Sequence, residues 1–74
     1  MNKTEEVIMQ EIDRKGHANI EHGMIKGRSF GARIVNVRNS LLEKGCVKII
    51  RRSVERDAEH GRGSVLYLST IEKA

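Results

Sequence analysis

Arginine and asparagine recur at intervals of three residues in the middle of this chain, at Arg33, Asn36 and Asn39. On a helix these side chains share one face, together with Ala32 and Val35. Arginine can bond O6 and N7 of guanine together, asparagine can bond N6 and N7 of adenine, and small apolar groups can touch thymine methyls. We therefore expect these five residues to read base edges in double-stranded DNA. The alternative is an ordinary solvent-facing surface, although two exposed asparagines weaken a helix without structural return.

Charge is concentrated in the same region of the sequence. The chain has a formal net charge of +4, and residues 26–52 hold all but six of its 14 lysines and arginines against one acidic residue, Glu43. Such a basic segment is typical of proteins that bind a polyanion. A basic surface that only keeps the protein in solution is the alternative.

The elements that must position these side chains can be read from local patterns, and we expect one domain over residues 1–74. Helix-favouring residues capped by Thr4 or Asn2 predict a first helix over about 4–15, ended by Gly16. A second, weaker helix is expected over about 20–26. A third is expected over about 30–44, with Ser29 as its N-cap. Two β-branched segments joined by a polar loop predict a hairpin over about 46–70.

The third helix has the clearest apolar periodicity. Phe30, Ile34, Val37 and Leu41 follow one another by four, three and four residues, so they form one stripe that we expect to face the core. The arginine and asparagine face would then point outward.

This order of elements, and the passage Leu41-Leu42-Glu43-Lys44-Gly45-Cys46-Val47, resemble the winged-helix family of DNA-binding proteins. The resemblance implies an α+β fold: a three-helix winged helix-turn-helix with a C-terminal two-stranded β-hairpin wing. It also implies that the third helix enters the major groove while the wing touches the DNA backbone. The residues that would then contact phosphates are Arg28, Ser29, Arg38, Ser40, Arg51, Arg52, Arg56 and Arg62.

Catalysis finds little support in the sequence. His17, His22, His60 and Cys46 are too scattered to suggest a metal site, so we expect no catalytic residue, no metal and no cofactor. The two aromatic residues, Phe30 and Tyr67, are both placed for the core. We therefore do not expect the base stacking by which single-stranded nucleic acids are usually bound.

The leading hypothesis is a small sequence-specific transcriptional regulator of a phage or plasmid, with double-stranded DNA as its partner. One alternative is a winged-helix adaptor that binds an acidic protein partner, such as a component of the transcription machinery. Another is a nonspecific architectural DNA binder. No apolar run approaches the roughly 20 residues of a membrane span, and the single cysteine fits a reducing cytoplasm. We expect a free monomer, with dimers on DNA left open.

Overall fold

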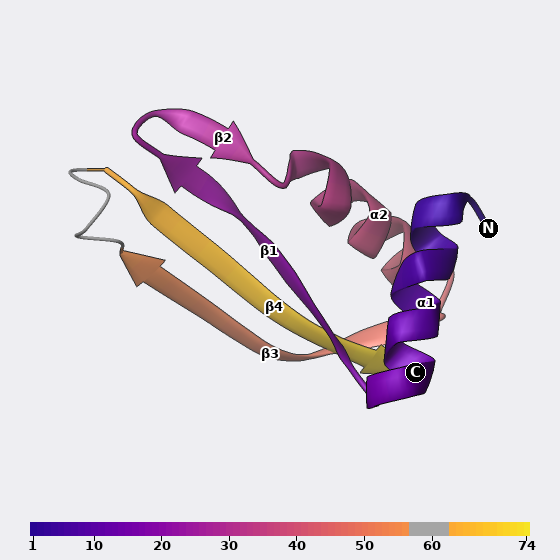
Figure 1. The fold of residues 1–74 in the computed structure, drawn as a ribbon. Helices are drawn as coiled ribbons and strands as arrows, with labels where there is room; N and C mark the ends of the chain where they lie inside the picture. The colour runs from indigo at the N-terminus through magenta and orange to yellow at the C-terminus, as the bar shows by residue number, and fades with distance from the viewer. Residues whose placement is uncertain (57–62) are drawn as a thin grey trace.

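Two helices cover one end of a four-stranded antiparallel sheet in the computed structural model, which describes residues 1–56 and 63–74. Helix α1 spans Lys3–Lys15 and helix α2 spans Ala32–Glu43. The strands are β1 (Ala18–Ile25), β2 (Arg28–Phe30), β3 (Val47–Arg56) and β4 (Val65–Lys73), in the sheet order β2-β1-β4-β3. Figure 1 shows that the strands run on well beyond α1, and this projecting end of the sheet, in which β1 and β4 remain paired, is called the arm below.

The winged-helix expectation is therefore wrong, because the chain has two helices and four strands in its described residues. The segment expected as a second helix is β1, and β2 includes Ser29, the expected N-cap of the third helix, and Phe30, its expected first residue. No helix-turn-helix exists in this part of the chain. Only the antiparallel pairing of β3 with β4 corresponds to the expected wing.

A tight turn explains why residues 20–26 are not helical. Ile25 pairs with Arg28, so only Lys26 and Gly27 form the loop, and both have positive φ, 51° and 78°. Two left-handed residues between paired strands match a type I′ turn, which suits the twist of a hairpin. Gly23 favours the strand as well, because a Cβ there would collide with the backbone of Val65 on β4.

Helix α2 begins two residues later than expected. Its N-cap is Gly31, with φ 77° and no side-chain capping bond, and Ser29 lies in β2 instead. A Cβ at Gly31 would lie 2.9 Å from His22 Cα. The glycine therefore lets the start of α2 pack directly on the backbone of β1.

Helix α1 has both of its ends defined by the sequence. Asn2 and Glu5 form a reciprocal capping box, in which Glu5 N donates to Asn2 Oδ1 at 2.8 Å and Asn2 N donates to Glu5 Oε1 at 3.2 Å. Gly16 ends the helix in the left-handed conformation. None of the helices in the described residues is long and apolar enough to cross a membrane.

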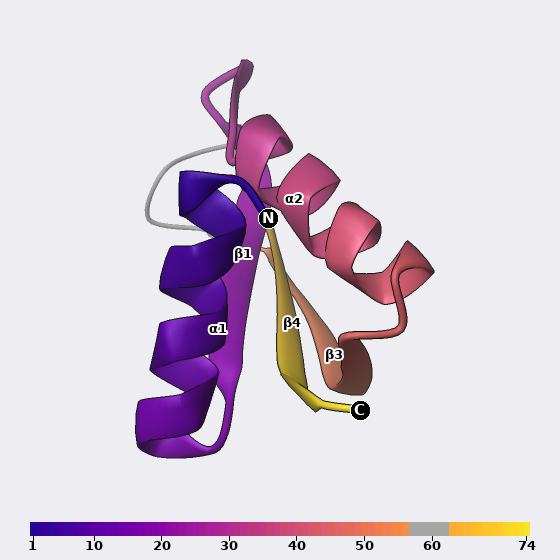
Figure 2. The same ribbon diagram turned by 90° about the vertical axis from the view of Figure 1, so that its right-hand side faces the viewer.

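The core lies between the two helices and the covered end of the sheet (Figure 2). Both helices, β1, β3 and β4 contribute its buried residues, which are Ile8, Ile12, Ala18, Ile20, Leu41, Val47 and Ile71. Leu41 and Ile71 are fully buried, with 0% of their surface exposed. Phe30, expected in the core stripe, is only partly buried on β2 and does not belong to this cluster.

A β-bulge decides which side chains of β3 face the helices. The register shifts between Ile49, which pairs with Ile71, and Arg51, which pairs with Thr70. Beyond the bulge Arg52 pairs with the buried Ser69, so alternate residues from Arg52 onward lie on the helix side of the sheet. Arg51 consequently lies on the opposite, outer side.

Candidate functional site

The face of the sheet on which the helices pack continues toward the projecting end of the strands. There it carries cationic, aromatic and apolar side chains. Pairing across the strands arranges them in rows, which are Ile20–Ser69–Arg52, His22–Tyr67–Val54 and Met24–Val65–Arg56. The last two rows and the residues Ser69 and Arg52, together with Arg38 from α2, are called the arm surface below. Three of the large apolar or aromatic side chains exposed in the structure belong to it: Met24 (41%), Val54 (62%) and Tyr67 (42%).

His22 and Tyr67 form the centre of the arm surface. Their rings are stacked from opposite positions of β1 and β4, with centroids 5.0 Å apart and planes inclined by 18°. Two grooves, of about 280 and 290 Å³, meet at this ring pair. The first is lined by Arg38, Arg52 and Val54 among others, and the second by Met24, Phe30 and Ala32 among others.

His22 has an unusual polar atom. Its Nδ1 is buried and forms no hydrogen bond with any described residue. Buried polar atoms are nearly always paired in native proteins. Because this atom is enclosed, it is the ring of His22 and not its Nδ1 that borders the two grooves.

Arg38 is held over the arm surface by two neighbours. Its Nη1 donates to Ser69 Oγ at 2.9 Å, and its Nε and Nη2 donate to Asn39 Oδ1 at 3.2 and 2.9 Å. Burial, and secondly repulsion from Arg52, lower the pKa of Arg38. Among the described residues neither arginine has an ion pair with a carboxylate. Two adjacent cations without a counter-ion form a site where an anion is favoured.

The two faces of the arm differ in charge. Glu21 and Glu55 pair with Leu68 and Leu66 and therefore lie on the outer face, which also carries Arg51. Within residues 1–56 and 63–74 the arm surface holds arginines and no carboxylate. The arm surface is therefore the more strongly positive side of the sheet.

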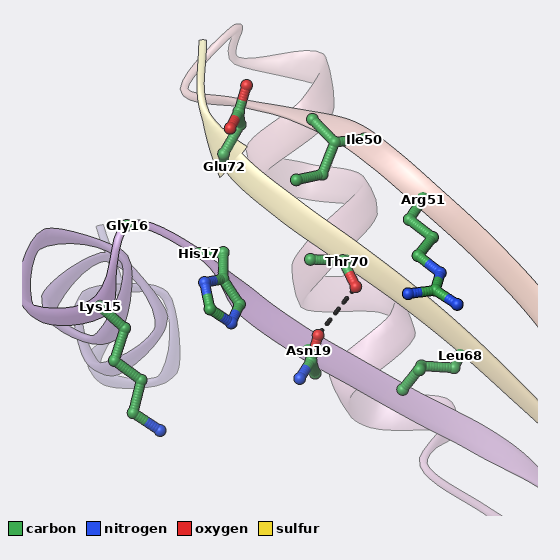
Figure 3. A pocket seen from close by; sticks show the side chains of 9 residues that line it. All are labelled: Lys15, Gly16, His17, Asn19, Ile50, Arg51, Leu68, Thr70 and Glu72. Carbon is green, nitrogen blue, oxygen red and sulfur yellow. Dashed lines mark hydrogen bonds between the residues drawn. The ribbon is translucent and has the colours of Figure 1, made fainter.

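The outer face of the sheet has the larger groove, of about 510 Å³ (Figure 3). Figure 3 shows Asn19 and Thr70 pointing toward one another across β1 and β4, and Thr70 Oγ1 donates to Asn19 Oδ1 at 2.8 Å. Glu72 at its edge is already paired with Lys48, with 3.2 Å between Oε1 and Nζ. Since its polar groups are mixed in charge and several are paired, this groove is the weaker candidate for binding an anion.

The residues expected to read bases are not all on one surface. Ala32, Arg33, Asn36 and Asn39 are exposed on α2, but Asn39 already accepts from Arg38. Val35 is partly buried and packs against the core, contrary to the outward position expected for it. The face of α2 that packs on the core is wider than the expected stripe, since it includes Val35 and Leu42 as well as Ile34 and Val37.

The residues expected to contact phosphates are also divided. Arg38, Arg52 and Arg56 lie together on the arm surface. Ser40 instead turns toward α1, where its Oγ donates to Glu5 Oε2 at 3.5 Å. Arg28 and Ser29 are exposed on β2, Arg51 lies on the outer face, and Arg62 is outside the described residues.

Sequence reasoning missed His22, Met24, Val54 and Tyr67 as site residues. A signal was present, because Ala18, Ile20, His22 and Met24 alternate with polar residues or glycine in the manner of a strand. Tyr67 was expected in the core, whereas it lies on the exposed arm. Among the described residues, no three histidine, cysteine or acidic side chains are close enough to hold a metal ion.

The fold and the site together define a small α+β protein with a cationic, partly aromatic sheet surface. No family model matches this chain, and no match was found to a curated protein or to a solved structure.

Proposed function

We propose that this protein binds nucleic acid through the arm surface. The observation that carries the proposal is the juxtaposition of the partly buried Arg38 with Arg52, neither of which has a carboxylate partner among the described residues. Phosphates of a nucleic-acid backbone would supply the missing negative charge. Arg56, two rows further along β3, extends the same charge along the arm.

The geometry of arginine suits this role. Its planar guanidinium donates paired hydrogen bonds to phosphate oxygens. Arg38 is already oriented by Ser69 and Asn39, so less conformational freedom is lost on binding. Contacts of this kind raise the affinity for nucleic acid but discriminate little between base sequences. A nucleic-acid ligand and the single cysteine, Cys46, also fit a cytoplasmic protein.

Sequence-specific binding to double-stranded DNA is the second candidate. It is favoured by the exposure of Arg33 and Asn36 on α2, where both could present donors and acceptors to base edges. A transcriptional regulator would use this face, and Arg33→Ala should then relax specificity while the variants of the arm surface should not. An adaptor for an acidic protein partner would use the same arginines without any nucleic acid.

The test compares two arginines on one strand. Arg52 and Arg51 are neighbours on β3 with side chains on opposite faces. Arg52→Gln and Arg51→Gln remove the same charge from the chain, so overall charge is matched. Binding of labelled single-stranded and duplex oligonucleotides is measured by fluorescence anisotropy between about 50 and about 200 mM salt.

Arg52→Gln should weaken binding and reduce the slope of log affinity against log salt by roughly one unit, which corresponds to the loss of one phosphate contact. Arg51→Gln should change the slope much less. Equal effects of the two variants would show that only net charge matters, and absence of binding to either oligonucleotide at low salt would remove nucleic acid as the ligand.

A further inference from the structure

We infer that the stacked rings of His22 and Tyr67 receive an unpaired base, so that the preferred ligand is single-stranded nucleic acid. This inference rests on the proposed binding of nucleic acid and adds which form of it is bound. It contradicts the expectation that both aromatic residues serve the core.

The exposure of Tyr67 is the first argument. It is 42% exposed and belongs to the same row as Val54, and Met24 follows in the next row. A surface that only kept the protein in solution would gain nothing from three large apolar or aromatic side chains exposed together. Base stacking on aromatic side chains is the usual basis of binding to single strands, and it tolerates any sequence because every base has a π-face.

The position of the arginines relative to the rings is the second argument. The Arg52 row and the Arg56 row lie on either side of the ring row. Neighbouring rows on one face are two residues apart along a strand, or about 7 Å. That separation is within the span of one nucleotide, so a base at Tyr67 would have cations available for the phosphates on both sides of it.

The grooves are the third argument. One groove joins the ring pair to Arg38 and Arg52, and the other joins it to the apolar side chains of Met24 and Phe30. A base in either groove would contact the ring pair. In a duplex the bases are stacked and paired with each other, so their faces are not available to these rings. Phosphate contacts alone would bind duplex and single strand without this distinction.

Tyrosine fluorescence gives a direct readout. The chain has one tyrosine and no tryptophan, so all of its tyrosine emission comes from Tyr67. We expect an oligo(dT) probe of about 12 nucleotides to quench this emission at saturation. A matched oligo(dT)–oligo(dA) duplex and inorganic polyphosphate should leave it nearly unchanged. Free N-acetyltyrosinamide with the same probes corrects for absorption by the nucleic acid.

Two substitutions at the same position separate stacking from folding. Tyr67→Leu removes the ring and keeps an apolar side chain, whereas Tyr67→Phe keeps the ring. Tyr67→Leu should weaken binding of oligo(dT) by roughly 5- to 100-fold, and Tyr67→Phe by much less. Ile50→Ala, at an exposed apolar position on the outer face, is the control. Thermal melting of each variant checks that it is folded, and oligo(U) in place of oligo(dT) tests RNA.

The possible outcomes distinguish the inference from the function on which it rests. Loss of oligo(dT) binding in Tyr67→Leu with retention in Tyr67→Phe supports both. Binding that depends on Arg52 but neither quenches Tyr67 nor responds to Tyr67→Leu overturns the stacking and leaves the function intact. Binding of the duplex as tightly as the single strand also overturns the inference. No binding to any nucleic acid overturns both, and leaves an acidic protein partner as the ligand to be sought.

Discussion

Glu5 is the residue that joins the two helices most directly. Its carboxylate is almost fully buried and accepts from Lys44 Nζ at 2.8 Å, while the other oxygen closes the capping box of α1. The hydrogen bond from Lys44, and next that from the Asn2 backbone, hold the pKa of Glu5 below its usual value of 4.5, against the opposing effect of burial. Glu5 is therefore more readily ionised in the folded state than in the unfolded chain.

The lowered pKa predicts how stability depends on pH. Because the folded state holds the carboxylate ionised, Glu5 contributes its full stabilisation above the unfolded pKa, and this contribution is lost as pH falls through the lower folded pKa. Glu5→Gln should therefore lower the melting temperature near neutral pH. The difference from the unsubstituted protein should shrink as the pH falls below about 4.5.

Glu6→Gln is the matched control, since it removes the same charge from an exposed position one residue away. It should change the melting temperature far less at neutral pH. The melting temperature of Glu5→Gln could instead stay below that of the unsubstituted protein by the same amount from neutral to acidic pH. Lost packing, rather than lost charge, would then be responsible.

At the scale of elements, the β1–β2 hairpin depends on its two-residue turn. Lys26 is the one non-glycine residue with positive φ among the described residues, a conformation that asparagine adopts more readily. Lys26→Asn would create an Asn-Gly turn and should stabilise the fold by up to about 1 kcal/mol. Thermal or urea unfolding measures this change. Gly27→Val should have the opposite sign, and a destabilised Lys26→Asn variant would show that the turn is not of type I′.

Elements defined by local signals could be predicted from the sequence, and those defined by distant partners could not. Asn2, Glu5 and Gly16 specify α1 by contacts within a few residues. Strand β1, in contrast, is stabilised by pairing with β4, in which His22 meets Tyr67 and Ala18 meets Ile71. The helical propensity of residues 20–26 is a local property and carries no information about that pairing. The segment was therefore wrongly expected to be a helix.

The candidate site was found only in part for the same reason. The basic segment was visible in composition, but the bulge near Ile50 decides that Arg52 and not Arg51 joins Arg38. Exposure of Tyr67 follows from relative lengths: nine strand residues extend for about 30 Å, whereas α1 extends for about 20 Å. Tyr67 lies beyond the reach of α1 and stays 42% exposed, and no local pattern shows this.

For the whole molecule, stability rests on a small core centred on Leu41 and Ile71. Ile71→Ala should cost roughly 2–5 kcal/mol, because it leaves a cavity between Ala18 and Ile49 in the middle of the sheet. So small a domain has little more than this in total. Ile50→Ala, which truncates the same side chain at a position 50% exposed, should cost much less. Chemical unfolding of both variants tests the prediction, and equal losses would contradict the described core.

The position of β4 in the sheet has a consequence for the time at which the protein can fold during synthesis. Strand β4 is made after the other strands, yet it lies between β1 and β3 and is the partner of both. Until residues 65–73 have left the ribosome, β1 lacks one neighbour and β3 has none, so the nascent chain cannot complete its sheet. The pairing of β4 with β1 also joins residues far apart in sequence, such as Ala18 and Ile71, which slows folding. We therefore expect folding to follow translation of β4, and a ribosome-bound chain stalled before Val65 should be fully sensitive to protease.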